Sequence, residues 1–211
     1  VFFEPSSRTI NVFSGFIQDE ITLIEDTLRV TIGTKLEHND YSGFEYQPSA
    51  RFAWTPTKEQ TIWGAVSRAV RTSSRFDADL RLRGLRPDPG FPPGSYFEIR
   101  GTDDFDPEEL LAFELGYRVQ PQGRVSLDFT AFYHVYDNLR SFEFGRRETD
   151  GTFIVKPIIF DNKYRGITSG GSAAVGYQLT QWWRWNGGYT LLLKDLDRSH
   201  GSTGPTPQVG G

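Results

Sequence analysis

Long stretches in which apolar and polar residues alternate constrain the fold of this chain more than any other feature. Within residues 124–136 every second residue is apolar, namely Val125, Leu127, Phe129, Ala131, Tyr133 and Val135. The positions between them carry all the polar side chains of the segment, with Phe132 as the main exception. A period of two is the mark of a β-strand whose two faces meet different surroundings. The segment is therefore predicted to be a strand with one apolar and one polar face.

The same alternation recurs along the chain. It is clear in residues 27–37, 110–119 and 183–194, and weaker in residues 8–24, 47–55, 61–70 and 161–179. No segment carries a convincing helical stripe, so the pattern predicts an all-β chain of about eight strands. Ordinary strands average about 5–6 residues, whereas a tilted strand that crosses a membrane needs about 9–11. The predicted strand lengths favour membrane-spanning strands.

The predicted connections alternate between short and long. The short ones lie at residues 25–26, 56–60, 120–123 and 180–182. The long ones cover residues 38–46, 71–107 and 139–160, and the last is expected to hold a hairpin around Gly151. Short turns at one end and long loops at the other are typical of outer-membrane barrels. The fold class predicted is therefore a segment of an antiparallel transmembrane β-barrel, with short periplasmic turns and long extracellular loops.

Aromatic residues gather near the predicted short turns. Rings at a membrane–water boundary form girdles around such barrels. A membrane-interface girdle in contact with outer-membrane lipid is therefore predicted for Trp54, Trp63, Tyr117, Tyr177, Trp182 and Trp183. The alternative interpretation is that these rings form the core of a soluble β-protein.

Composition narrows the function further. Hydrophobic residues make up 37% of the chain, close to what a barrel with a polar interior needs, and no apolar run approaches a spanning helix. The net charge of −4 argues against nucleic acid as a partner, and the absence of Cys excludes a disulfide framework. The chain opens Val1-Phe2-Phe3 without a signal-peptide pattern, so we interpret it as an internal piece of a longer protein. Residues 1–198 are predicted to be partial barrel, and residues 199–211 a loop or tail.

Four motifs resemble those of TonB-dependent outer-membrane receptors of the siderophore type. The run Pro48-Ser49-Ala50-Arg51-Phe52-Ala53-Trp54-Thr55-Pro56 is similar to their PSARxAWTP strand and turn, and residues 61–72 resemble the strand after it. Residues 109–118, ending Phe-Glu-Leu-Gly-Tyr-Arg, resemble their ELGYR strand, and residues 160–176 a later strand with its Asn and Gly residues. The motifs span nearly the whole chain in the family's order. The usual Pro after the AVRT sequence is Ser73 here, which affects only the start of a loop.

The resemblance implies a location in the bacterial outer membrane and energy-coupled import of a ferric siderophore or a similar scarce solute. It also implies that TonB is a partner through an N-terminal region, which we expect to lie outside this chain together with the plug domain and the final strand. About eight of the family's roughly 22 strands would be represented here. Because such a piece leaves two strand edges unpaired, we expect it by itself to fold poorly, to close into a smaller, non-native barrel, or to form an open, curved sheet.

An arginine group in the predicted loop 71–107 is the candidate ligand-binding site. Guanidinium groups present a rigid fork of donors to anionic oxygens, and many ferric siderophores are anionic. Ligand contact is therefore predicted for Arg75, Arg81, Arg83 and Arg86. The alternative is that these arginines are solvated, or pair with Asp77, Asp79 and lipopolysaccharide phosphates.

Nothing in the sequence indicates catalysis, a metal or a cofactor. The acidic run at residues 103–109 matches no EF-hand loop. His38, His134 and His200 lack a metal-ligand spacing, and His134 is expected to face the barrel lumen. No GxSxG elbow or phosphate loop is present.

Two competing functions remain open at this point. One is a stand-alone eight-stranded outer-membrane barrel with a structural or adhesive role, since eight strands can close. The other is a barrel-type membrane enzyme, for which the sequence offers no nucleophile and base.

Overall fold

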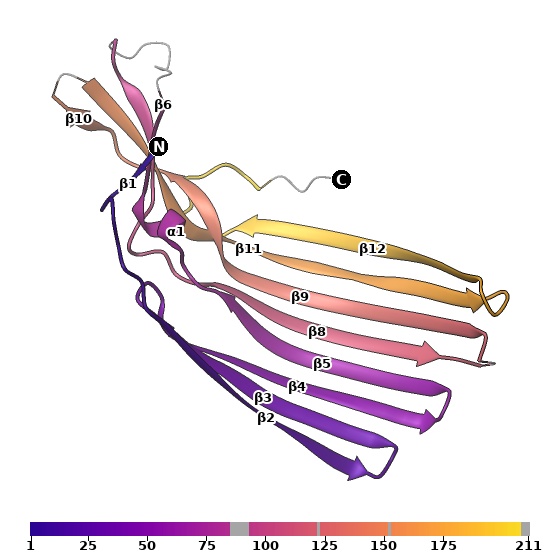
Figure 1. Ribbon diagram of the computed structural model, residues 1–211. Helices are drawn as coiled ribbons and strands as arrows, with labels where there is room; N and C mark the ends of the chain where they lie inside the picture. Colours follow the sequence, from indigo (N-terminus) through magenta and orange to yellow (C-terminus); the bar gives the residue numbers. More distant parts are fainter. Residues whose placement is uncertain (85–92, 122, 152, 208–211) are drawn as a thin grey trace.

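Eight long strands form one curved, open sheet in the computed structural model, which describes residues 1–84, 93–121, 123–151 and 153–207 (Figure 1). In sheet order they are β2 (Val12–Ile24), β3 (Leu28–Asn39), β4 (Gly43–Thr57), β5 (Gln60–Arg71), β8 (Glu108–Val119), β9 (Val125–Phe144), β11 (Phe153–Gln178) and β12 (Arg184–Arg198). All their pairings with one another are antiparallel. The expected fold class is confirmed, and the number of long strands matches the expected number of about eight. Of the alternatives expected for an isolated piece, the structure shows the open, curved sheet.

A smaller part of the same hydrogen-bonded sheet, called the small sheet below, continues from the ends of β9 and β11. Its short strands are β1 (Phe2–Phe3), β6 (Leu80–Gly84), β7 (Tyr96–Arg100) and β10 (Glu148–Asp150), and the helix α1 (Arg75–Asp79) leads into β6. The first residues of β11 pair with β10 and, in parallel, with β7. Register shifts between Asp161 and Gly166 mark the bulge where β11 passes from one part of the sheet to the other. No helix among the described residues is long and apolar enough to cross a membrane.

The connections are asymmetric, as predicted. The short turns that follow β2, β4, β8 and β11 all lie at the same end of the sheet in Figure 1. The opposite end carries α1 and the small sheet, including the expected hairpin, whose turn contains Gly151 with φ 62°.

Two of the predicted long loops consist mainly of strand. Residues 139–160 fall largely within β9, β10 and β11, with the expected hairpin between the last two. Residues 38–46 form strand almost throughout, with a turn of only three residues between Asn39 and Gly43. The Asn39 Oδ1 atom accepts hydrogen bonds from the backbone N–H groups of Tyr41 and Ser42, and Gly43 adopts φ 69°. This Asx-type turn replaces the loop, because its polar residues satisfy the backbone locally.

The two faces of the main sheet differ as the alternation predicts. Across five strands, Ile62, Tyr117, Phe129, Ala173 and Tyr189 occupy one row on the apolar face. Many large side chains of this face are solvent-exposed in the isolated chain. A buried apolar cluster exists instead at the long-loop end, where Leu80, Phe105 and Phe160 pack together. The apolar face of the main sheet therefore needs a non-aqueous environment.

The segment after β12 folds back over the small-sheet end and contains no strand within residues 199–207. Its Ser202 Oγ and Gly204 N–H donate hydrogen bonds to the buried Glu143 carboxylate, both at 2.9 Å. The expected division into a partial barrel over residues 1–198 and a loop or tail over residues 199–211 stays a prediction.

The predicted aromatic girdle divides between the two faces. Trp54 and Tyr117 share the apolar face, and Tyr177 lies on the same face nearer the turns. Trp63 lies on the polar face, which corrects the expectation for this residue: a Cβ atom at Gly116 would lie 2.2 Å from its indole ring. Neighbouring residues of a strand point to opposite faces, so closeness to a turn does not decide which face a ring occupies. Trp182 and Trp183 stack in the last turn with ring centroids 6.3 Å apart. For these two residues and the three on the apolar face, the girdle stays a prediction.

The contact between Gly116 and Trp63 is testable in a membrane-inserted protein that contains these residues. Gly116→Ala is expected to lower the free energy of unfolding by about 1–3 kcal/mol, because the new methyl group overlaps the indole ring. Urea unfolding in vesicles measures this. Gly15→Ala is the control, since a Cβ atom there meets nothing within 4 Å. Equal effects of Gly116→Ala in the presence and absence of Trp63→Ala would contradict the contact.

Candidate functional site

The candidate site is built around α1, a single helical turn at the long-loop end of the sheet. The Asp77 carboxylate accepts hydrogen bonds from the Ser74 N–H at 3.1 Å and the Ser74 Oγ at 2.8 Å, which starts the helix. Asp77 and Asp79 are nevertheless almost completely buried, with 0% and 1% of the residue exposed. Buried carboxylates need charged partners, so this turn must be surrounded by cations.

Asp77 receives two of those cations from the main sheet. Arg71 of β5 places Nη1 at 3.0 Å from one carboxylate oxygen, and Arg140 of β9 places Nη1 at 3.1 Å from the other. Arg71 also bonds Glu108 of β8 through Nε at 2.6 Å. One buried carboxylate thus connects α1 to neighbouring strands of the main sheet.

Asp79 binds a different set of partners. Arg8 lies 2.9 Å from one carboxylate oxygen, while Arg75 at 3.4 Å and the Tyr41 hydroxyl at 3.3 Å contact the other. Arg8 belongs to the N-terminal segment and Tyr41 to the turn between β3 and β4. The helix is therefore attached on two sides.

Gly101 lets the chain after β7 pass directly beside α1. Its N–H donates to the Leu80 carbonyl at 2.9 Å, and the next N–H, of Thr102, donates to the Asp77 carbonyl at 2.9 Å. A Cβ atom at position 101 would lie 2.4 Å from the backbone of Ala78. Only glycine allows this close approach.

The small sheet carries a row of ion pairs on one face. Glu98 of β7, 3% exposed, contacts Arg83 Nε at 2.6 Å and also Arg100. Arg100 continues the row to Glu148 of β10 at 2.8 Å. The row connects β6, β7 and β10 on this face of the small sheet, because neighbouring charges along it have opposite signs.

The carboxyl groups of Asp77 and Glu98 have pKa values below their ordinary range. Burial would by itself raise the pKa of Asp77, but hydrogen bonds from Arg71 and Ser74 outweigh it, and the pKa is lowered. Burial likewise opposes the lowering of the Glu98 pKa, which Arg83 and Arg100 bring about. These carboxyl groups therefore stay ionised at neutral pH.

Three of the four arginines predicted to bind ligand lie among the described residues at the long-loop end, each with partners of its own. Arg75 and Arg83 pair with Asp79 and Glu98, while Arg81 donates to the Gly101 carbonyl at 3.0 Å and lies 3.5 Å from Glu4. Arg86 lies outside the described residues. The pairing of Arg75 with Asp79 matches the alternative interpretation of these charges. Sequence reasoning did not identify Arg8 and Arg140, because their partners Asp79 and Asp77 lie far away in the chain. It also missed Arg100, which pairs with Glu98 of its own strand and with the distant Glu148.

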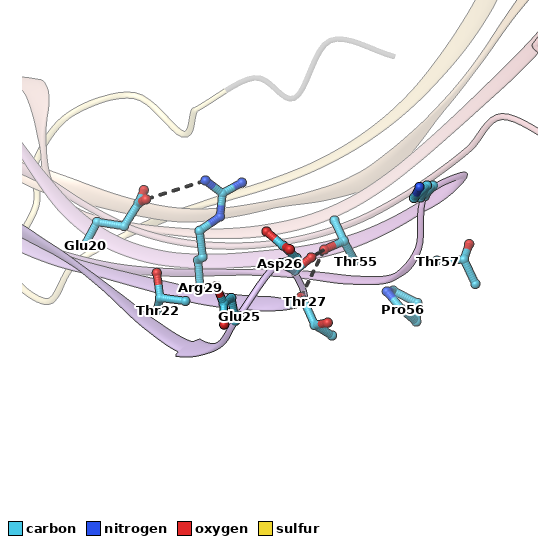
Figure 2. Close-up of a pocket in the computed structure, with 10 residues that line it drawn as sticks. Glu20, Thr22, Glu25, Asp26, Thr27, Arg29, Thr55, Pro56 and Thr57 are labelled. Atoms are coloured by element: carbon cyan, nitrogen blue, oxygen red, sulfur yellow. Dashed lines mark hydrogen bonds and ion pairs between the residues drawn. The ribbon is translucent and has the colours of Figure 1, made fainter.

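A polar hollow of about 1020 Å³ lies at the short-turn end of β2, β3 and β4 (Figure 2). Figure 2 shows Glu20 and Arg29 reaching toward each other from neighbouring strands, at 3.6 Å, with Asp26 beside the turn. Its other lining groups are mostly threonine hydroxyls and charged side chains. Sequence analysis missed this hollow because three strand ends build it.

The residues considered as possible metal ligands do not form a cluster within the described residues. His134 lies on the polar face of β9, as expected, with Nε2 3.9 Å from Glu114. Within the described ranges, no group of three or more His, Asp or Glu residues is placed to hold a metal ion.

Long strands with one apolar face, asymmetric connections and an ordered small sheet at one end define the wall of a membrane β-barrel. Residues 3–210 match the family described as TonB dependent receptor-like, beta-barrel. The chain belongs to this family.

Named relatives are similar over part of their length. The chain is 24% identical over 212 residues to the ferric enterobactin receptor of Pseudomonas aeruginosa, covering 93% of this chain and 27% of that protein. It is 30% identical over 122 residues to an iron-regulated outer membrane virulence protein of Vibrio cholerae, covering 58% of this chain and 17% of that protein. The chain thus spans about a quarter or less of the length of these relatives.

Solved structures share the fold. The siderophore receptor PirA from Pseudomonas aeruginosa superposes with a TM-score of 0.74 at 19% identity, covering 90% of this chain and 35% of that one. PirA from Acinetobacter baumannii gives 0.71 at 18% identity, covering 93% and 29%.

The close approach at Gly101 predicts a local effect. Gly101→Ala is expected to detach α1 from the chain after β7, because the added methyl group overlaps the Ala78 backbone. Hydrogen exchange at residues 75–82 in the intact receptor should accelerate at least about tenfold, the equivalent of about 1.4 kcal/mol. Gly84→Ala in the same small sheet is the matched control, since its Cβ atom would meet its nearest neighbour at 3.9 Å. Similar exchange in both variants would contradict the role of Gly101.

The attachment of α1 through Asp77 is expected to weaken in acid. Its folded-state pKa lies below the ordinary value of about 3.9, so its stabilisation is complete above that pH and disappears as pH falls through the folded-state pKa. Asp77→Asn should weaken the attachment at pH 7 by about 1–3 kcal/mol and remove this part of the pH dependence. Hydrogen exchange of α1 between pH 7 and 2 measures both effects. An unchanged acid response in Asp77→Asn would assign it to other carboxylates.

Proposed function

We propose that this chain forms part of the wall and extracellular surface of an outer-membrane receptor that takes up a ferric siderophore. The observation that carries the proposal is the match of residues 3–210 to the receptor barrel family, on strands long enough to cross a membrane. The named ferric enterobactin receptor supports iron–siderophore complexes as the ligand class. Two of the relatives are named as receptors, which agrees with the expectation that the protein is not an enzyme.

The two faces of the sheet then receive distinct roles. The apolar face contacts outer-membrane lipid, and the polar face lines the lumen. The end that carries α1 and the small sheet faces the outside of the cell. Energy coupling through TonB would act on parts of the protein other than these 211 residues.

The ligand surface is proposed at Arg75, Arg81 and Arg83. Their side chains are 31%, 24% and 52% exposed, so each side chain is partly accessible to solvent. A guanidinium has five N–H donors, and the intramolecular partners use only some of them. The same partners hold the groups in place, which lowers the entropic cost of binding an anion.

Replacing these arginines tests the proposal in the intact receptor. The triple variant Arg75→Gln, Arg81→Gln and Arg83→Gln is expected to weaken binding of an anionic ferric siderophore by at least about tenfold, because charge-assisted hydrogen bonds are lost. Titration calorimetry with ferric enterobactin as the first probe, followed by other ferric siderophores, measures the affinity.

The control is Arg124→Gln, which changes one arginine in the turn at the opposite end. Binding of ferric siderophores with unaltered affinity in the triple variant would overturn the ligand surface while leaving the receptor function. A receptor that binds no ferric siderophore and restores no growth under iron limitation would overturn the proposed function itself.

A further inference from the structure

A hollow of about 510 Å³ lies on the apolar face of the main sheet, in the half nearer the short turns. Its floor consists of the small residues Ala131, Gly171 and Ala173, and aromatic rings stand around it. None of its lining residues is charged. The hollow therefore has the polarity of a hydrocarbon site.

Strand register explains why the hollow forms. In one row Ala173 lies between Phe129 of β9 and Tyr189 of β12. In the next row Ala131 and Gly171 are paired beside Leu115 of β8. Large side chains thus flank small ones across β8, β9, β11 and β12, and the surface is recessed between them.

The surroundings of the hollow indicate what occupies it. Leu115 and Tyr189, which line the hollow, are 54% and 72% exposed, and the exposed apolar side chains Leu191 and Leu193 continue from Tyr189 on the same face of β12. On the side of the short turns, Tyr177 and Trp185 form the next aromatic pair of the same face. Such rings mark the depth of lipid headgroups, so the hollow lies in the acyl region of the leaflet beside the turns.

We propose that this hollow binds one acyl chain of a phospholipid in the periplasmic leaflet. Within a bilayer the gain comes from van der Waals packing, because lipid tails are as apolar as the wall. A flexible chain fills the recess and restores the contacts that small residues leave unmade. The inference rests on the membrane location in the proposed function.

The test uses the intact receptor purified in mild detergent and incubated with palmitoyl-oleoyl phosphatidylethanolamine. Native mass spectrometry then counts the lipids retained. Ala131→Phe fills the floor of the hollow and is expected to reduce retention of the first lipid roughly tenfold. Leu127→Phe is the matched control, because Leu127 lies on the same face of the same strand outside the hollow lining.

Three outcomes overturn the proposal. Equal lipid retention in both variants would remove the site, and displacement of the phospholipid by added lipopolysaccharide would assign the hollow to the other lipid. A changed oligomeric state of Ala131→Phe with unchanged lipid retention would assign it to a protein partner.

Folding and function are monitored on the same samples. Heat-dependent gel migration reports barrel formation, and Ala173→Leu provides a second filling variant if Ala131→Phe does not fold. Ferric siderophore binding separates the two proposals: retained lipid without siderophore binding leaves the hollow in place and removes the receptor function. If the unaltered receptor binds ferric siderophore but retains no lipid, the receptor function stands and the lipid site is overturned.

Discussion

Backbone pairing between long antiparallel strands is the interaction on which the rest of the structure depends. β5 and β8, for example, stay in register from Gln60 opposite Val119 to Arg71 opposite Glu108. A membrane offers no water to backbone amides, so spanning strands must satisfy one another. Continuous register also keeps every second side chain on the same face. The lipid-facing band and the polar wall are therefore two consequences of one ladder.

At the long-loop end, beyond the main sheet, ion pairs hold the connecting segment in place. The segment between β5 and β8 contains a helix turn and two short strands, and buried carboxylates attach it to the sheet below. Asp77 joins α1 to β5 and β9, and Asp79 joins it to the N-terminal segment. The described residues of this segment form a platform of short elements on the sheet. An anionic ligand would meet arginines whose positions are already set.

Sequence reasoning succeeded where its signal is local. The alternation of residues 124–136 predicted both faces of β9, and the turn signals placed the short connections at one end. The prediction failed for Trp63, where a shift of one residue along the strand decides which face of the sheet a side chain occupies. Trp63 follows Ile62 directly, yet these neighbours lie on opposite faces. Residues 38–46 looked like a loop because they are polar, but Asn39 closes a three-residue turn.

The sequence by itself determined the number of long strands, the two faces of the sheet, the end of the sheet at which the short turns lie, and the resemblance to the family. These properties depend on a period of two and on motifs contained within single strands. Only the tertiary structure decided that Arg140 meets Asp77 and that Arg8 meets Asp79, 63 and 71 positions apart. It alone revealed the apolar hollow, whose floor and rim come from separate strands. The ion pairs depend on how α1 and the N-terminal segment lie against the sheet, and the hollow depends on register between strands. No single stretch of sequence records either.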